Sequence, residues 1–155
     1  MKGFGNSIAL SDDDVLGIPP EVSALSLKLA LDAAGCDLEE YAFICGHGLA
    51  SVEGDRSELR SIMSIFDGKR IDIALCGLKP YTGHLGAASD IGEIILGIES
   101  ARQGIVPATL NFLEAEREYR DLKISGSRQP CQGSCVMTVS YGTGGQSCVS
   151  VVQAV

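Results

Sequence analysis

The chain has 155 residues, of which 45% are hydrophobic, so it carries enough apolar side chains for about one ordinary domain with a core. Its formal net charge of -8 excludes broad electrostatic binding to nucleic acid or to an anionic membrane, which needs clusters of lysine and arginine. The start, MKGFGNSIALSDDD, has too short an apolar run for a signal peptide or a membrane span, so we expect a soluble cytoplasmic protein.

The predicted elements alternate between helices and strands. The run Glu21–Ala34 predicts a helix, and Gly35 follows it as a stop signal. One face of this helix carries Val22, Leu25, Leu29 and Ala33. YAFICG is typical of a short buried strand, and after the loop HGLASVEG a second helical pattern begins. Its inward positions are Leu59, Ile62, Met63 and Phe66.

The same order of strand and helix is repeated in the middle of the chain. IDIALCG predicts a strand, and Ala87–Arg102 predicts a helix. The apolar positions of that helix are Ile91, Ile94, Ile95 and Ile98. Strands that alternate with helices favour a sheet of parallel neighbours with helices packed on it.

The last third of the sequence has a different character. CVMTVSYG and QSCVSVVQAV are strand-like runs around the glycine-rich turn GTGG, which predicts a terminal antiparallel hairpin. Residues 107–132 are mostly polar, and DLKIS is their one strand candidate. We therefore expect one α/β domain over residues 1–155, with a mixed sheet in βαβαββ order and helices packed on it.

Six cysteines are spread along the chain, and we interpret them as buried thiols. They are Cys36, Cys45, Cys76, Cys131, Cys135 and Cys148. Their positions in apolar runs and single loops do not resemble the disulfide framework of a small secreted protein. Cys131 and Cys135 form a close pair, but no second pair or histidine pair completes a tetrahedral site, so we expect neither a metal nor a cofactor.

The two histidines of the chain each follow a predicted strand. His47 comes directly after YAFICG, and His84 lies in the loop after IDIALCG, so both are expected in one crevice at the carboxyl ends of parallel strands. Two neutral imidazoles there can donate hydrogen bonds to a developing oxyanion. The alternative is that both histidines are loop residues that only satisfy nearby backbone groups. Lys79 would raise the local positive potential, and we expect it to form an ion pair with Glu93.

Several segments resemble the motifs of a known enzyme family. CGHGLASVEGDRSE, LKPYTGHLGAASDIGE and SYGTGGQS are similar to HGTxTxxGDxxE, KxxxGHxxGAAGxxE and SFGFGGTN, and VPATLNF is similar to VPPTxNL. These are motifs of the C-terminal half of beta-ketoacyl-acyl-carrier-protein synthases, the condensing enzymes of the thiolase-like fold. The resemblance covers nearly the whole chain, and it implies a thiolase-like C-terminal half.

The resemblance also implies roles for the candidate site residues. His47 and His84 correspond to the histidines that bind the thioester carbonyl and assist malonyl decarboxylation, and Lys79 to the lysine that organises the site. The implied supporting residues are Glu93, as the acidic partner of the lysine, and Asp55 and Glu58, with mainly structural roles. Decarboxylative condensation in fatty acid or polyketide synthesis is the function that these roles imply.

The chain departs from the family pattern where the acyl chain and pantetheine are expected to bind. The implied binding positions are Leu49, Ser51, Thr143, Gly144 and Gly145. Leu49 and Ser51 stand where the family has two threonines that touch pantetheine, so one hydroxyl is lost. Thr143 replaces the phenylalanine that gates the acyl pocket, and Gln146 begins the segment that replaces the final Thr-Asn. These changes imply weakened or altered binding of the carrier.

The family's nucleophilic cysteine is the largest departure. Family enzymes carry it in an N-terminal half, at a helix N-terminus that lowers its pKa. MKGFGNS resembles the loop GYGxSxD that joins the two halves, so the chain is expected to begin where the second half begins. Cys45, two residues before His47, is expected to pack beside the sheet as a small hydrophobic residue and not to replace the nucleophile.

Three functions remain open at this point. The chain is the C-terminal subunit of a split condensing enzyme whose cysteine lies on another chain, a non-catalytic subunit similar to a chain-length factor, or a small enzyme that acts on acyl thioesters without a covalent intermediate. The expected partners are an acyl carrier protein or acyl thioester and a cysteine-bearing N-terminal half or full ketosynthase. We also expect a homo- or hetero-oligomer, because half of a thiolase-like fold leaves an apolar face open to water.

Overall fold

The computed structural model describes residues 1–10, 18–66, 72–142 and 144–155. The helices are α1 (Ala24–Ala34), α2 (Val52–Ile65), α3 (Lys79–Thr82) and α4 (Ser89–Arg102), with short 3-10 turns at Leu38–Glu40, Gly86–Ala88 and Arg117–Tyr119. The strands are β1 (Gly3–Ile8), β2 (Tyr41–Gly46), β3 (Ala74–Gly77), β4 (Ile105–Val106), β5 (Lys123–Ile124), β6 (Gln129–Pro130), β7 (Cys135–Tyr141) and β8 (Gln146–Gln153).

The main sheet is six-stranded and mixed, with the strand order β1-β8-β7-β2-β3-β5. β2 is parallel to both β3 and β7, and β5 is parallel to β3. β7 and β8 form the expected antiparallel hairpin. The α/β fold with a mixed sheet is therefore confirmed. The βαβαββ order omitted β1, which pairs with β8, and the two-stranded β4-β6 sheet.

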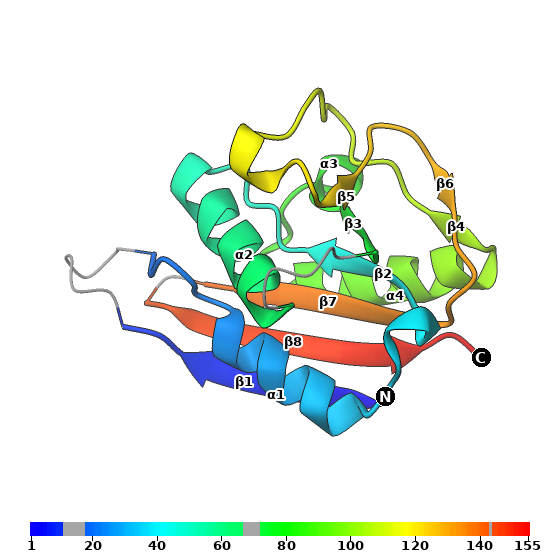
Figure 1. Cartoon of the computed structure of the whole chain (residues 1–155), viewed down its shortest axis with the longest axis horizontal. Helices are drawn as coiled ribbons and strands as arrows, with labels where there is room; N and C mark the ends of the chain where they lie inside the picture. The colour runs from blue at the N-terminus through cyan, green and yellow to red at the C-terminus, as the bar shows by residue number, and fades with distance from the viewer. Residues whose placement is uncertain (11–17, 67–71, 143) are drawn as a thin grey trace.

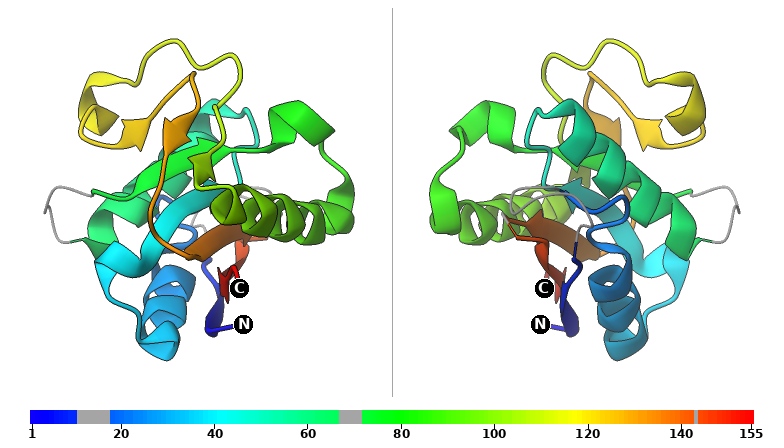
Figure 2. Two further views of the ribbon diagram at one scale, coloured as in Figure 1. Left: turned by 90° about the vertical axis from the view of Figure 1, so that its right-hand side faces the viewer. Right: turned by 90° about the vertical axis from the view of Figure 1, so that its left-hand side faces the viewer.

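Helices cover both faces of the sheet, with α1 and α2 on one side and α4 on the other (Figures 1 and 2). Alternate residues of the central strands supply two hydrophobic clusters. Met137 and Val139 of β7 belong to the cluster beside α1 and α2, whereas Val136 belongs to the cluster beside α4. Because β2 is buried along its whole length, its carboxyl end is held firmly in the middle of the molecule.

Strand β1 was not predicted because its small residues face the helix and its large ones face away. A Cβ added at Gly3 or Gly5 would meet the backbone of α1, so close packing of strand and helix requires glycine at both positions. Phe4 and Ile8 point to the opposite face of the sheet and are 58% and 66% exposed. This is the reverse of the alternation that indicates a half-buried strand.

Most of the inward face predicted for the first helix was wrong, because only Val22, which precedes α1, is buried. Leu25 and Leu29 are 57% and 42% exposed, and the buried stripe is Ser26, Leu27 and Ala30. Ser26 can occupy this stripe because its hydroxyl donates to the Ser23 carbonyl at 2.9 Å. A buried hydroxyl with a hydrogen-bond partner costs little, and a hydropathy pattern does not detect that partner.

The other two long helices agree better with the sequence pattern. The α2 positions predicted to face inward all contact the core beside α1. Two of the four predicted positions of α4, Ile94 and Ile98, contact the core on the opposite side of the sheet. The other two, Ile91 and Ile95, are 61% and 60% exposed. No helix among the described residues is long and apolar enough to cross a membrane.

The six cysteines are free thiols, although not all of them are buried. Cys45, Cys76 and Cys135 are buried, as expected, and Cys36 and Cys131 are half-buried. The expectation was wrong for Cys148, which is exposed on β8. β8 follows the edge strand β1 in the sheet order, and this end of the sheet leaves one face of β8 open on the side of α4.

Candidate active site

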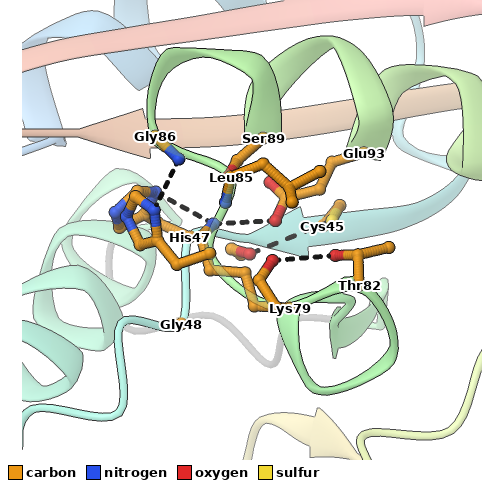
Figure 3. A network of polar contacts seen from close by, with 12 residues as sticks. Cys45, His47, Gly48, Lys79, Thr82, Leu85, Gly86, Ser89 and Glu93 are labelled. Atoms are coloured by element: carbon orange, nitrogen blue, oxygen red, sulfur yellow. Dashed lines mark hydrogen bonds and ion pairs between the residues drawn. The ribbon is translucent and has the colours of Figure 1, made fainter.

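The structure brings the two histidines together, as predicted from their positions after strands. His47 follows β2, and His84 follows the short helix α3 that begins after β3. Their ring centroids lie 5.8 Å apart, with the ring planes nearly perpendicular. Both rings line one crevice of about 1230 Å³, which the ends of β1, β7 and β8 also border. Figure 3 shows His47 beside Lys79, which in turn contacts Glu93.

His47 is buried and electrically neutral. Its Nδ1 atom lies 3.2 Å from the Nζ atom of Lys79, and its side chain is beside the sheet end at 4% exposure. Burial, and next the positive charge of Lys79, lower the pKa of His47 to about 4. Because the lysine donates to Nδ1, the imidazole carries its proton on Nε2, and among the described residues no acceptor binds that N–H.

His84 reaches the same tautomer by a different contact. Its Nδ1 atom accepts a hydrogen bond from the backbone amide of Gly86 at 3.0 Å. A ring that accepts at Nδ1 carries its proton on Nε2. Two imidazoles of one crevice thus have Nε2–H groups available as donors, which is the condition for stabilising an oxyanion.

Lys79 joins the histidine loop to helix α4. Its Nζ atom donates to Oε1 of Glu93 at 2.7 Å, which confirms the predicted ion pair. Both side chains are almost fully buried, at 7% and 2% exposure. Burial raises the pKa of Glu93, although the bond with Lys79 opposes this shift. A buried pair of this kind fixes both side chains, because removing either partner would leave an uncompensated charge.

Glu58 holds the backbone on which His47 is mounted. Its carboxylate accepts from the amides of His47 at 2.5 Å and Gly48 at 3.0 Å. Burial raises the pKa of Glu58 to about 7, against the lowering effect of these two amides. Asp55 lies one turn earlier in α2, and burial raises its pKa as well. Their contacts agree with mainly structural roles for both.

The residues predicted to bind the acyl chain or pantetheine are only partly gathered at the crevice. Leu49 lines it and is 39% exposed. Ser51 instead caps α2, where its hydroxyl accepts from the amide of Gly54 at 3.2 Å. Gly144 and Gly145 form a turn with φ of 85° and 75°, a backbone that favours glycine. Thr143 lies outside the described residues.

Tyr141 and Cys148 are among the crevice residues that the sequence analysis missed. The Tyr141 ring centroid lies 4.4 Å from that of His47, so this tyrosine packs against the catalytic candidate. Its position in SYGTGGQS, where the family motif has its first phenylalanine, was an available signal. Cys148 also lines the crevice, but burial and the charge of Asp90 raise the pKa of its thiol. A raised pKa disfavours the thiolate that a nucleophile requires.

Cys45 does not lie in the crevice. It is fully buried beside β3, where contact with Cys76 and then burial raise its pKa well above the ordinary value. It therefore packs as a small hydrophobic residue, as expected. In the part of the chain that the structure describes, no three histidine, cysteine, aspartate or glutamate side chains are grouped to hold a metal ion.

A family model described as "Beta-ketoacyl synthase, C-terminal domain" matches residues 7–113 of the chain. The lovastatin diketide synthase mokB of Monascus pilosus is 28% identical over 146 residues, which cover 90% of this chain and 6% of that protein. Nodulation protein E of Rhizobium sp. (strain N33) is 30% identical over 112 residues, which cover 70% of this chain and 28% of that protein. The chain thus spans less than a third of these relatives.

Solved structures share the whole fold of this chain. A beta-ketoacyl synthase from Burkholderia phymatum matches with a TM-score of 0.85 and 25% identity, over 99% of this chain and 37% of that one. The ishigamide ketosynthase/chain length factor matches with a TM-score of 0.82 and 26% identity, again over 99% of this chain and 37% of that one. The predicted thiolase-like architecture is therefore confirmed.

Proposed function

Because this chain belongs to the beta-ketoacyl synthase C-terminal domain family, we propose that it supplies His47, His84 and Lys79 to a condensing site in fatty acid or polyketide synthesis. The nucleophilic cysteine of that site would lie outside these 155 residues, on a complementary N-terminal half. The proposal rests on one observation above all: two imidazoles lie 5.8 Å apart in one crevice, and each has its Nδ1 atom occupied.

The proposed chemistry follows from the available N–H groups. A malonyl thioester that loses CO₂ leaves an enolate, whose negative charge gathers on the thioester oxygen. The Nε2–H groups of His47 and His84 would donate to this oxygen and stabilise the charge as it develops. Lys79 would keep His47 in the donating tautomer and would itself be held by Glu93. This chain would therefore supply the groups that stabilise the enolate.

The thiol chemistry would belong to the complementary half. Cys45 is sealed in the core, and the pKa values of Cys45 and Cys148 are both raised, so neither thiol favours the thiolate form at neutral pH. The proposed partners are an acyl carrier protein, as in a matched structure titled a ketosynthase with its acyl-carrier protein, and a cysteine-bearing ketosynthase chain. We place this assembly in the cytoplasm.

A second candidate function is that of a non-catalytic subunit. Leu49 removes a hydroxyl from the wall of the crevice, and Gln146 replaces the threonine of the family motif in the same wall. One matched structure is titled a ketosynthase/chain length factor. In that function the chain would shape the acyl pocket of a partner, and His47 and His84 of this chain would take no part in catalysis.

Mass spectrometry can separate the two functions. We would mix the chain with a separately expressed N-terminal half of the Burkholderia synthase, add a short acyl thioester, and locate the acyl group by intact mass. The proposal predicts a stable complex with the acyl group on the complementary half and condensation product after malonyl thioester is added. A stable, acylated complex without product would favour the non-catalytic function, and acylation of Cys148 would contradict the proposed division of roles.

A further inference from the structure

We propose that Cys36 and Cys135 form a reversible disulfide when the chain meets hydrogen peroxide, and that this bond is a redox-sensitive bridge between helix α1 and the sheet. Their Sγ atoms lie 3.7 Å apart, although the two residues are 99 positions apart in the chain. A disulfide holds its sulfur atoms about 2.0 Å apart, so the two atoms must approach by roughly 1.7 Å. The proposal therefore rests on two thiols that are already in contact.

The sheet separates this pair from the other thiols of the chain. Cys36 and Cys135 both pack in the hydrophobic cluster beside α1 and α2. Three other cysteines pack in the cluster beside α4, on the opposite face of the sheet, and these are Cys45, Cys76 and Cys131. Cys148 points to that opposite face as well, because it lies four residues before Val152 on the same regular strand. Cys135 is therefore the cysteine that Cys36 faces.

The two cysteines are held in the structure in different ways. Cys135 is 0% exposed and begins β7, where it pairs with Tyr41 of β2 and Gln153 of β8. Its backbone is thus fixed between two neighbouring strands. Cys36 is half-buried in the connection between α1 and the 3-10 turn at Leu38–Glu40. Because this connection is not part of the sheet, Cys36 would make the approach that closes the bond.

The difference in exposure also sets the order of the chemical steps. Cys36 is the thiol that peroxide can reach, and its sulfur would attack one peroxide oxygen. An S–O bond forms, the O–O bond breaks, and the departing hydroxide leaves as water with the thiol proton. The product is a sulfenic acid at Cys36, which is the form that condenses with a second thiol.

Cys135 would supply that second thiol. Its sulfur attacks the Cys36 sulfur, so that an S–S bond forms, the S–O bond breaks, and a second water leaves with the proton of Cys135. The two thiols are oxidised together, and the peroxide is reduced to water. Burial, and next the contact with Cys36, raise the pKa of Cys135 to about 11, so this thiol is poorly suited to react first.

The bridge would fasten the end of α1 to the middle of the sheet. α1 packs on the edge strand β1, whereas β7 lies between β8 and β2. The bond would close a loop of about 100 residues, and a closed loop of this length strongly restricts the unfolded chain. Oxidation would therefore stabilise the fold. In a reducing compartment cellular thiols would reopen the bond, so it would respond to oxidant and not be permanent.

The bridge lies far along β7 from the catalytic crevice. Cys135 is the first residue of this strand, whereas Tyr141, the last one, lines the crevice. Neither Cys36 nor Cys135 lines the crevice. The bond would thus form without occupying the proposed substrate site, and the inference does not depend on the proposed function.

Peptide mapping by mass spectrometry tests the bridge. We would treat the folded chain with an equimolar amount of hydrogen peroxide, alkylate the remaining thiols under denaturing conditions, and digest the chain without reductant. We expect linked peptides that contain Cys36 and Cys135, alkylation of the other cysteines, and loss of the link after dithiothreitol. In parallel urea titrations, the unfolding midpoint should rise on oxidation and return after dithiothreitol.

Two serine variants provide the comparison. Cys36→Ser removes the half-buried thiol of the pair and should abolish both the link and the rise in the urea midpoint. Cys131→Ser is the matched control, because Cys131 is also half-buried but packs on the opposite face of the sheet. It should leave the link and the rise unchanged.

Three results would overturn the inference: oxidation of Cys36 to a sulfinic acid while Cys135 stays reduced, links made mainly by other cysteines such as Cys148, or a bridge that leaves the urea midpoint unchanged. If Cys36→Ser fails to fold, the peptide map and the urea titrations of the unchanged chain decide the question. Because no acyl transfer is measured, failure of the proposed function would leave this result intact.

Discussion

At the scale of single residues, the protonation of His47 is the property on which its proposed role depends. Burial and Lys79 lower its pKa from 6.5 to about 4, so the ring stays neutral through the physiological range. Because the folded chain binds a proton at His47 less readily than the unfolded chain does, the neutral ring contributes to folding stability fully above pH 6.5. This contribution of His47 is lost as the pH falls through about 4.

We predict that NMR titration of the His47 ring will show a midpoint near pH 4. Lys79→Met should raise this midpoint, because the repulsion between the ammonium and the imidazolium is removed, but burial should keep it below 6.5. Lys28→Met, at an exposed lysine paired with Asp32, is the matched control and should leave it unchanged. A midpoint near 6.5 in the unchanged chain would contradict the buried, lysine-bound ring.

Glu58 should make stability depend on pH in the opposite direction. Its pKa is raised from 4.5 to about 7, so its contribution to folding is complete below pH 4.5 and is lost as the pH rises through about 7. In the unchanged chain, the unfolding free energy should therefore fall by roughly 2–3 kcal/mol between pH 4.5 and 8 because of Glu58. We predict that Glu58→Gln, which cannot ionise, does not show this part of the fall. Urea titrations at several pH values would measure this fall, with exposed Glu53→Gln as the control. Parallel pH profiles of both variants would refute it.

Sequence reasoning found the histidines because each follows a strand in a parallel part of the sheet, where strand ends meet. It predicted the Lys79–Glu93 ion pair from the place of the lysine beside these histidines, and the resemblance to the family motif implied the same pair. It missed the contact between Tyr141 and His47, because that contact depends on the parallel pairing of β7 with β2. A pairing between strands so far apart in the chain cannot be read from local periodicity.

At the scale of elements, two glycines of α4 differ sharply in their surroundings. A Cβ at Gly97 would lie 2.9 Å from Cγ1 of Val136, whereas a Cβ at Gly92 would meet nothing within 4 Å. We predict that Gly97→Ala destabilises the chain by about 1–3 kcal/mol through overpacking. Gly92→Ala should stabilise it by roughly 0.5–1 kcal/mol through helix propensity.

Chemical denaturation of the two alanine variants checks this prediction directly, since the substitutions are identical and lie on one helix. Similar effects of the two would mean that α4 does not rest on β7 as described. A control for folding is the far-ultraviolet circular dichroism spectrum, which should keep the same shape in both variants.

The elements that were predicted correctly have continuous apolar runs, such as β2 and β7, or an apolar stripe with few polar residues, such as α2. The failures share a different cause. Glycines in β1 and serines in α1 occupy buried positions because of close backbone approach and specific hydrogen bonds. Such tertiary reasons are invisible to a pattern that ranks residues by hydropathy alone.

At the scale of the whole molecule, one face of the sheet is incompletely covered. Val136 of β7 and its partner Val152 of β8 both belong to the cluster beside α4. Ser150, two residues before Val152, points to the same face of the sheet. Phe4 of β1 pairs with Ser150 and therefore also lies on the face that α4 covers. Phe4, Ile8, Ile91 and Ile95 are each more than half exposed. Exposed apolar groups of this kind mark a surface for another protein.

We predict a homodimer or higher oligomer in sedimentation experiments at low micromolar concentration, and a cysteine-bearing half should compete for the same surface. Ile95→Glu should shift the chain toward monomer. Leu113→Glu, at an apolar residue that is 94% exposed in the segment after β4, should not. A stable monomer that binds no hydrophobic dye would contradict the prediction.

The central claim is that the crevice of this chain stabilises the enolate of a malonyl thioester once a complementary half is present. The most direct measurement is CO₂ release by a chimera in which residues 1–155 replace the corresponding part of the Burkholderia synthase. Circular dichroism would first confirm that the chimera is folded. We predict malonyl decarboxylation that His47→Ala lowers by about a hundredfold or more, as expected for one lost oxyanion donor, and that Lys28→Ala leaves unchanged. A folded chimera that releases CO₂ equally well with His47→Ala, or not at all, would contradict the claim.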